Sequence, residues 1–338
     1  MKHNVDLDKN HPLDISRQAS INGDFEISEK ILREQPQNDL RVLFNLGWHE
    51  MRHGNLKKAM EHFNYGRYIN VFGNSAIPGK IWKDEPLKEK TLLFRCEGGY
   101  GDQICNFRFA KKFLEKGAKV LVSCEKNLME LFSRHGYICI DNKAAHFSHY
   151  DYWVPSMSAA FILDLEYEDI DGSQFLSSQE SHKLFAKKGS LKVGIRWSGS
   201  PDFEDEQNRR FPPELMIGLH DIPGTTFYSL QRDENLVEGL PFTDMKEQMK
   251  TWEDTAGIIN DLDLVITSCT SIAHLSAAMG KETWVVVPIL PYYIWSVPGN
   301  KSRWYESVTL FRQKKFGSWE EPFAEIRNSL EQKIKQRK

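Results

Sequence analysis

Asp263-Leu-Val-Ile-Thr-Ser-Cys-Thr-Ser-Ile-Ala-His-Leu-Ser-Ala-Ala-Met-Gly280 is the stretch that decides the fold. Its apolar start predicts a buried strand over residues 264–267, and its second half predicts a helix over about 271–279. The polar turn between them would place Ser268, Thr270 and Ser271 at the helix N-terminus, where free amides and the helix dipole favour an anion. His274, one turn into the helix, can add a donor there. The alternative is an ordinary N-cap, because Ser and Thr are common at helix starts.

Short apolar runs alternate with amphipathic stretches on both sides of this segment. We expect strands at 91–96, 119–123 and 137–140, with helices near 104–116 and 128–134 between them. A second series of strands is expected at 192–197, 226–230, 264–267, 283–287 and 307–311, followed by a helix from 319 to about 336. Such alternation predicts parallel sheets with right-handed crossovers. The two series predict two Rossmann-like domains, over residues 76–188 and 189–338.

Residues 1–75 predict a separate all-helical segment. Counted from Leu46, Gly47, Gly54, Ala59 and Phe63 follow at offsets of +1, +8, +13 and +17. This is the spacing of a tetratricopeptide repeat, in which small residues let two antiparallel helices approach closely. Residues 22–32 suggest a degenerate preceding repeat, and two repeats are too few to stand alone, so we expect the segment to pack on the next domain. A plain helical cap and a peptide-binding segment are equally weighted interpretations.

Composition narrows the class of protein. The chain has 338 residues, 40% of them hydrophobic, which suits two domains plus an appendage. A net charge of -3 gives no support to a nucleic-acid or anionic-membrane partner. No apolar run approaches the roughly 18 residues that span a bilayer, and the first eight residues lack the apolar core of a signal peptide. The five cysteines have no metal-like spacing, so we expect reduced thiols, no metal site and a cytoplasmic protein.

A glycine-rich loop follows the first expected strand of residues 76–188. Gly98, Gly99 and Gly101 allow positive φ and close backbone approach, and Asp102 stands where the next helix begins. Position alone favours an N-cap over a carboxylate facing a substrate. Because Ile104 occupies the third glycine position of the dinucleotide fingerprint, a nicotinamide cofactor is disfavoured.

Other strand ends of the last domain also carry small or polar residues. Gly199 and Ser200 follow one strand, and Gln231 follows the next. Arg209 or Arg210 could reach back to phosphates, where the planar guanidinium suits bidentate binding, although a solvated loop arginine is an even alternative. Ligands of open α/β sheets bind at this edge, and a strand that leads into a polar turn is how such proteins hold a diphosphate.

A set of short motifs occurs in order along residues 40–315. They are Glu97-x-Gly-x-Gly-Asp102, Trp197-Ser-Gly199, Ser229-Leu-Gln231, Asp254-Thr-Ala256, Thr270-Ser-Ile-Ala-His-Leu275 and Trp304-Tyr305. The set resembles tetratricopeptide-containing bacterial glycosyltransferases related to the ADP-heptose:lipopolysaccharide heptosyltransferases, and more distantly the O-linked N-acetylglucosamine transferases. The resemblance implies a GT-B fold, with two Rossmann-like domains facing across a cleft and a nucleotide-sugar donor held mainly by the C-terminal domain. It further implies transfer without a metal or cofactor, usually with inversion.

The resemblance also assigns roles to residues. Asp102 matches the general base of the family, while Thr270, Ser271, Ile272 and His274 match the diphosphate-binding turn. The 209–210 arginines fall near a basic residue that neutralises the donor phosphates. Heptosyltransferase relatives carry Asp before the Thr of the turn, where this chain has Cys269, so heptose specificity does not carry over.

The expected reaction is a direct displacement of a nucleoside diphosphate by an acceptor hydroxyl. The acceptor could be a glycan, a lipid-linked saccharide or a protein. A non-catalytic tetratricopeptide scaffold with a decayed site is the main alternative, and nucleotide affinity distinguishes it from a transferase. An oxidoreductase on the same architecture is a weaker alternative.

Overall fold

The structure is a computed structural model that describes residues 11–73, 76–234, 236 and 241–337. Contacts divide the chain into two compact units. One, here the six-stranded unit, comprises Met1–Gln35, Gly172–Lys250 and Asp254–Lys338; the other, the five-stranded unit, comprises Pro36–Asp171 and Thr251–Glu253. The expected division at residues 75 and 188 stays a prediction. The first eight residues, whose sequence predicts that they are not a signal peptide, lie outside the described residues.

The five-stranded unit is built on a parallel sheet with the order β1-β5-β2-β3-β4. Its strands are β1 (Lys80–Ile81), β2 (Thr91–Arg95), β3 (Lys119–Cys124), β4 (Ile138–Asp141) and β5 (Tyr152–Pro155). From β2 the chain adds β3 and β4 on one side and then β5 on the other, so the direction of winding reverses between β2 and β5. At such a switch point the loops diverge and leave a crevice at the carboxyl ends of the strands.

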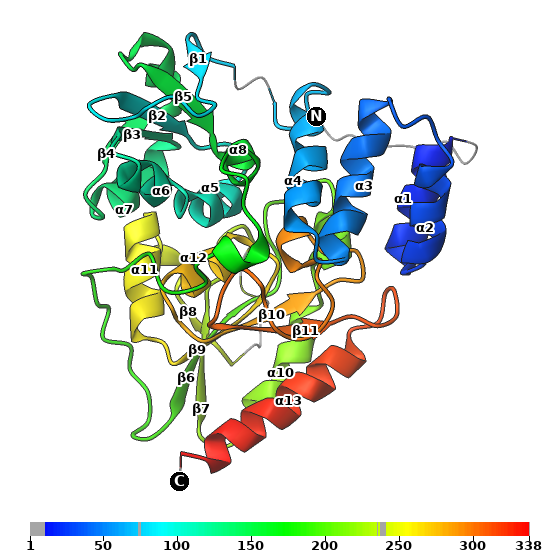
Figure 1. The fold of residues 1–338 in the computed structure, drawn as a ribbon. Coiled ribbons are helices and arrows are strands. Elements are labelled where there is room, and N and C mark those ends of the chain that lie inside the picture. The colour runs from blue at the N-terminus through cyan, green and yellow to red at the C-terminus, as the bar shows by residue number, and fades with distance from the viewer. Residues whose placement is uncertain (1–10, 74–75, 235, 237–240, 338) are drawn as a thin grey trace. The chain divides into compact units, whose positions relative to one another are not determined.

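Aromatic packing joins the helices of this unit to its sheet. The helices that follow β2 and β3 are α5 (Tyr100–Phe107), α6 (Ala110–Glu115) and α7 (Met129–Ser133), and α8 (Ala159–Ile162) follows β5. Phe94 of β2 contacts Phe113 of α6, with ring centroids 6.1 Å apart. Phe107 of α5 stacks on Phe132 of α7 at 4.0 Å. Figure 1 shows α5, α6 and α7 together on one face of this sheet.

The six-stranded unit also has a parallel sheet, with the order β11-β10-β9-β6-β7-β8. Its strands are β6 (Leu191–Arg196), β7 (Thr225–Ser229), β8 (Thr243–Asp244), β9 (Leu264–Ser268), β10 (Thr283–Val287) and β11 (Val308–Arg312). The winding reverses between the central strands β6 and β9, which pair in parallel with Arg196 opposite Thr267. The carboxyl ends of β6 and β9 therefore flank the switch point of this sheet.

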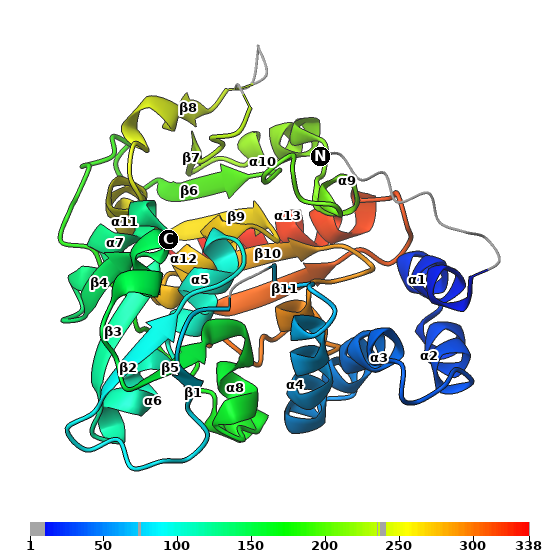
Figure 2. The same cartoon turned by 90° about the horizontal axis from the view of Figure 1, so that it is seen from above.

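Helices lie on both faces of the six-stranded sheet. They are α9 (Glu206–Arg209), α10 (Ile217–His220), α11 (Trp252–Asp261), α12 (Ser271–Ala278) and α13 (Glu320–Lys335), and the first two residues of α11 belong to the other unit. Leu219 of α10 and Ile326 of α13 share one apolar core with Ile195 and Ile266 of the sheet. Figure 2 shows α13 on one side of this sheet and α12 on the other.

In the described part of the chain, four α-helices precede the sheets and confirm the expected all-helical start. They are α1 (Pro12–Asn22), α2 (Phe25–Arg33), α3 (Leu40–Arg52) and α4 (Leu56–Asn64). A Cβ on Gly47 would lie 2.7 Å from the Phe63 ring, so the glycine lets α3 and α4 approach closely. The hairpin of α1 and α2 belongs to the six-stranded unit, and that of α3 and α4 belongs to the five-stranded unit. The tetratricopeptide identity of these helices stays a prediction.

The predicted parallel α/β architecture is confirmed, since every expected strand is present within two residues of its predicted ends. Three further strands, β1, β5 and β8, were not expected, because each is short and β5 ends in a proline. The single helix expected at 104–116 is wrong: the chain forms α5 and α6, separated at Arg108 and Phe109. Within the described residues, no helix combines the length and apolarity needed to cross a membrane.

Candidate functional site

The turn from β9 to α12 lies at the switch point of the six-stranded sheet. Thr270 holds the N-cap position with extended backbone, yet its side chain makes no capping hydrogen bond and its Oγ1 instead lies 3.3 Å from Thr267 Oγ1. The buried Oγ of Ser268 has no hydrogen-bond partner among the described residues. The helix therefore starts without the side-chain cap that the ordinary N-cap interpretation requires. Its first amides remain suited to an anion.

Other predicted residues of this turn are largely inside the protein. Ser271 is half-buried and Ile272 is buried. His274 is buried too: its Nδ1 lies 3.1 Å from Tyr305 Oη, and its ring stacks on Trp295 with centroids 5.2 Å apart. An aromatic cluster thus fixes the imidazole, and its role as a phosphate donor stays a prediction.

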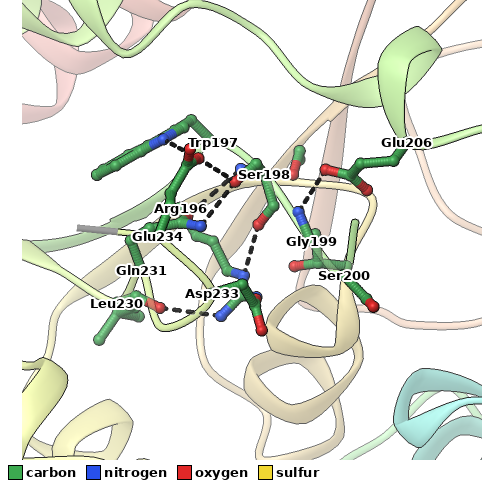
Figure 3. Close-up of polar contacts among 12 residues, drawn as sticks. Arg196, Trp197, Ser198, Gly199, Ser200, Glu206, Leu230, Gln231, Asp233 and Glu234 are labelled. Carbon is green, nitrogen blue, oxygen red and sulfur yellow. Dashed lines mark hydrogen bonds and ion pairs between the residues drawn. The ribbon is translucent and has the colours of Figure 1, made fainter. Parts of the chain in front are cut away.

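Arg209 reaches the turn from α9, the short helix that follows the loop after β6. Its Nη1 donates to the Cys269 carbonyl at 2.7 Å, and its Nε donates to Glu206 Oε2 at 2.6 Å. Glu206 also accepts the amide of Gly199 through Oε1, at 2.6 Å (Figure 3). One buried carboxylate therefore joins the glycine loop to the arginine that contacts the turn.

Gly199 is the place where these elements meet most tightly. A Cβ at this position would come within 2.4 Å of Arg209 Nη2 and 3.1 Å of Thr270 Cγ2. Only glycine leaves room for the guanidinium beside the turn. The loop after β6, α9 and the N-terminus of α12 therefore converge. Three residues predicted to bind the sugar donor, Gly199, Arg209 and Thr270, lie together there.

Arg210 pairs with a different carboxylate, and its role in phosphate binding stays a prediction. Its side chain is 49% exposed, and its Nη2 is 3.5 Å from Glu234 Oε2. Of the two arginines that the sequence leaves as alternatives, Arg209 is the one beside the turn. Ser200, which follows Gly199, is exposed.

Gln231 is buried and links the loops after β6 and β7 by hydrogen bonds. Its Nε2 donates to Ser198 Oγ at 2.6 Å, and its Oε1 accepts the Ser198 amide at 3.4 Å (Figure 3). Ser198 Oγ and Trp197 Nε1 both donate to Glu234. These bonds hold both ends of the Gln231 amide within the protein, and the role of Gln231 in donor binding stays a prediction.

A buried arginine bridges the same two loops. Arg196 donates to the carbonyl oxygens of Ser198 and Leu230, at 2.8 and 3.1 Å, and pairs with Asp233. Burial lowers the pKa of Arg196 from its usual value, although an arginine keeps its charge at physiological pH.

Cys269 provides no charge at the turn. Its Sγ lies 3.5 Å from the Val286 carbonyl, and burial raises the pKa of the thiol to about 12. The side chain is therefore a neutral thiol at neutral pH. Among the described residues, no group of three or more His, Cys, Asp or Glu side chains is gathered as metal ligands would be. The expectation of a metal-free reaction stays a prediction.

The predicted glycine loop of the five-stranded unit connects β2 to α5. Gly98 has φ +73°, and a Cβ there would lie 2.6 Å from Asp102 Oδ2. Asp102 is half-buried in the first turn of α5 and accepts the Gly99 amide at 3.0 Å, as a helix-capping carboxylate does. Gly101 lies in the same turn. Capping and a catalytic role are compatible, and the catalytic role stays a prediction.

Glu97, at the start of this loop, has no role predicted from the sequence. Its amide donates to Ser156 Oγ at 3.0 Å, and its Oε2 accepts the Met157 amide at 3.3 Å. Ser156 follows β5, so Glu97 joins the two loops that flank the switch point of this sheet. Glu206 was missed altogether; its place three residues before Arg209 in a helical stretch is the signal that indicates an ion pair.

Comparison by sequence identifies a distant relative of the chain. No family model matches the chain. Protein FlbA of Caulobacter vibrioides is 22% identical over 293 residues, covering 75% of this chain and 48% of FlbA. The chain thus spans about half the length of this curated relative.

Two solved structures resemble the chain over most of its length. The iron-containing dodecameric glycosyltransferase TibC of enterotoxigenic E. coli is 12% identical, with a TM-score of 0.51 over 75% of this chain and 78% of TibC. A glycosyl transferase family 9 protein of Veillonella parvula is 11% identical, with a TM-score of 0.52 over 69% and 88% of the two chains. A second structure of TibC describes it as a heptosyltransferase and contains ADP-D-beta-D-heptose. At such low identity these matches show the fold: this chain has the α/β fold of heptosyltransferase-like glycosyltransferases.

Proposed function

We propose that the protein is a glycosyltransferase that moves a sugar from a nucleotide-diphosphate sugar to an acceptor hydroxyl. One observation carries the proposal: Gly199, Arg209 and the uncapped start of α12 converge at the switch point between β6 and β9. Open α/β sheets bind their ligands at this point. The fold shared with TibC and the Veillonella protein supports the same function.

The donor diphosphate would lie against the N-terminus of α12. Its oxygens would accept hydrogen bonds from the first amides of the helix, with the positive end of the helix dipole beneath them. Arg209, 2.7 Å from the Cys269 carbonyl, would add a guanidinium at the same end. Both groups would stabilise the charge that grows on the diphosphate as it leaves.

Asp102 would act as the general base. The acceptor oxygen would form a bond to the anomeric carbon, the bond from that carbon to the diphosphate oxygen would break, and the hydroxyl proton would pass to the Asp102 carboxylate. A single displacement of this kind inverts the anomeric configuration and involves no metal. Glu97 is a poorer candidate, because its side chain is 1% exposed and Arg67 binds both of its oxygens.

The remaining parts of the proposal concern substrates and location. The donor would be a nucleotide sugar, and the acceptor would be a glycan, a lipid-linked saccharide or a protein. The reaction would take place in the cytoplasm. The helices α1 to α4 would be tetratricopeptide-like, serving as a helical cap or a peptide-binding segment.

A thermal-shift series tests the donor site. The full chain is heated with ADP, GDP, UDP and the matching nucleotide sugars, and at least one should raise the melting temperature, because a ligand that binds only the folded state stabilises it. The variant Arg209→Met should lose most of that shift. Arg210→Met is the matched control and should keep it, since Arg210 is half exposed and pairs with Glu234 instead of the turn carbonyl. If no nucleotide shifts the melting temperature of the wild-type chain, the transferase proposal fails.

Cys269 gives specific support to a second candidate, a binding protein with a decayed transferase site. A neutral buried thiol stands where heptosyltransferases carry a carboxylate. Such a protein could bind a nucleoside diphosphate and yet turn over no donor. Release of nucleoside diphosphate from a nucleotide sugar that binds, with and without acceptor, separates the two candidates.

A further inference from the structure

We infer that the α1–α2 hairpin is a positioning element of the donor site and that Arg17 is its positioning residue. The inference rests on the proposed function, because it concerns how Arg209 is held for a donor. In physical terms, Arg17 would fix α9, and α9 would present Arg209 at the β9–α12 turn.

The first observation is an ion pair between α1 and the residue before α9. Arg17 Nη2 lies 2.7 Å from Asp205 Oδ1, and the two side chains are 30% and 26% exposed. Asp205 is the N-cap residue of α9, but its side chain makes no capping hydrogen bond. The carboxylate instead accepts from Arg17 and, at 3.0 Å, from Asn208 Nδ2. The Asp205 carboxylate thus links α1 to α9, because it accepts from Arg17 of the first helix and from Asn208 of the second.

The second observation is that α9 depends on contacts with the rest of the six-stranded unit. A helix of four residues is far below the length that is stable alone, so external contacts must hold it. Its contacts run through Glu206 to Gly199, and through Arg209 to the Cys269 carbonyl and to the Phe203 ring, whose centroid is 4.2 Å from the guanidinium carbon. Movement of the start of α9 would therefore move Arg209 as well.

The third observation is that buried hydrogen bonds join the two helices of the hairpin that carries Arg17. Ser28 Oγ of α2 lies 2.9 Å from Ser16 Oγ and 2.7 Å from Ser20 Oγ of α1, and all three residues are buried. At the end of α1, a Cβ on Gly23 would lie 3.2 Å from Ile289 Cγ2, in the segment after β10. The hairpin therefore contacts the segments after β6 and after β10 in the same unit.

These contacts give the N-terminal helices a role that a passive cap would lack. A cap would protect apolar surface, and loss of one ion pair at its edge would leave the ligand site unchanged. A positioning element transmits that loss to Arg209, since the five residues from Asp205 to Arg209 connect the ion pair of Arg17 to the second arginine. Donor affinity should then depend on Arg17, which is outside the proposed site.

A double-mutant cycle on the full chain tests this inference. Calorimetry with the nucleoside diphosphate that stabilises the wild-type chain most gives the dissociation constants of Arg17→Met, Asp205→Asn and the double variant. Each single variant should bind about fivefold more weakly, the low end of coupling between sites. The double variant should bind no more weakly than either, because both changes remove one interaction. Arg17→Lys should restore most of the affinity.

The control and the contrary results are specific. Lys30→Met removes an exposed cation of α2 from the same hairpin and should leave affinity unchanged. Equal affinity of Arg17→Met and wild type, or full additivity in the double variant, would overturn the inference. Hydrogen exchange of residues 206–210 gives a readout without nucleotide: it should be faster in Arg17→Met. Unchanged exchange overturns the inference even if the nucleotide binds, whereas faster exchange in a chain that binds no nucleotide overturns the proposed function alone.

Discussion

Arg67 and Glu97 form a bidentate ion pair at the switch point of the five-stranded sheet. Nη1 of Arg67 lies 2.8 Å from Oε1 of Glu97, and Nη2 lies 2.9 Å from Oε2. The glutamate side chain is 1% exposed and the arginine side chain is 16% exposed. Arg67 ends the short helix after α4, and Glu97 begins the loop that leads to Asp102. The pair therefore connects the α3–α4 hairpin to the loop that leads to Asp102, the proposed general base.

Breaking this pair should destabilise the five-stranded unit strongly. Arg67→Met leaves the Glu97 carboxylate buried without its cation, and such a loss costs about 3 kcal/mol or more. Urea titration followed by circular dichroism measures the change in the free energy of unfolding.

An exposed pair in the same unit provides the control. Lys57 and Asp164 lie 2.6 Å apart with side chains 54% and 68% exposed, so Lys57→Met should cost no more than about 0.5 kcal/mol. Equal losses in the two variants would contradict the view that burial makes the Arg67–Glu97 pair strong.

Asp102→Asn should abolish transfer and preserve donor binding. The amide oxygen of Asn can still accept the Gly99 amide that Asp102 accepts at 3.0 Å, so the loop should keep its conformation. Loss of a general base lowers the rate by about 10²–10⁴. Steady-state kinetics should show a fall in kcat, and calorimetry should show an unchanged dissociation constant for the nucleoside diphosphate. Asp84→Asn, in the segment after β1 of the same unit, is the control, and comparable kcat values for it and Asp102→Asn would remove Asp102 from the mechanism.

Most of the sheet framework was predictable from sequence because buried parallel strands appear as continuous apolar runs. β9, for example, is buried at every position and follows the expected range within one residue. The short edge strands β1 and β8 were not predictable from sequence, because two residues are too few to show a periodic pattern. The interruption between α5 and α6 was also missed, since no glycine or proline marks Arg108 and Phe109.

Site residues were predictable where backbone chemistry was decisive. Gly199 and Thr270 follow strands that meet at the sheet centre, so their proximity follows from topology. The choice between Arg209 and Arg210 depended on which of them pairs with Glu206, and sequence spacing left that open because offsets of three and four residues both allow a pair on a helix. Pairs across long separations, such as Arg67 with Glu97, give no local signal.

Gly199→Ala should weaken donor binding. The added methyl group would lie 2.4 Å from Arg209 Nη2 and would displace the guanidinium from the turn. Loss of a hydrogen bond to a charged group costs about 1.5–3 kcal/mol, so we expect binding of the nucleoside diphosphate to be weaker by about tenfold or more. Gly218→Ala is the matched control, because nothing lies within 4 Å of its added Cβ. The two variants should differ in calorimetry, and similar dissociation constants would argue against Arg209 as a donor contact.

The stability of the six-stranded unit should fall with alkaline pH because of Cys269. Burial raises the pKa of this thiol from 9.0 to about 12, so the folded chain keeps a proton that the unfolded chain loses. The resulting stability is fully present below pH 9 and is lost as the pH rises from 9 towards 12, at about 1.4 kcal/mol per pH unit.

Cys269→Ala removes this proton and isolates its effect. The difference in unfolding free energy between wild type and Cys269→Ala should shrink by about 1.4 kcal/mol between pH 8 and pH 10. Urea titrations of both proteins at the two pH values measure it, and other titrating groups cancel in the difference. Because Cys269 lies directly before Thr270, the same result would establish that the donor turn carries a neutral thiol at physiological pH. A difference that is constant with pH would mean that the thiol ionises alike in the folded and unfolded chain.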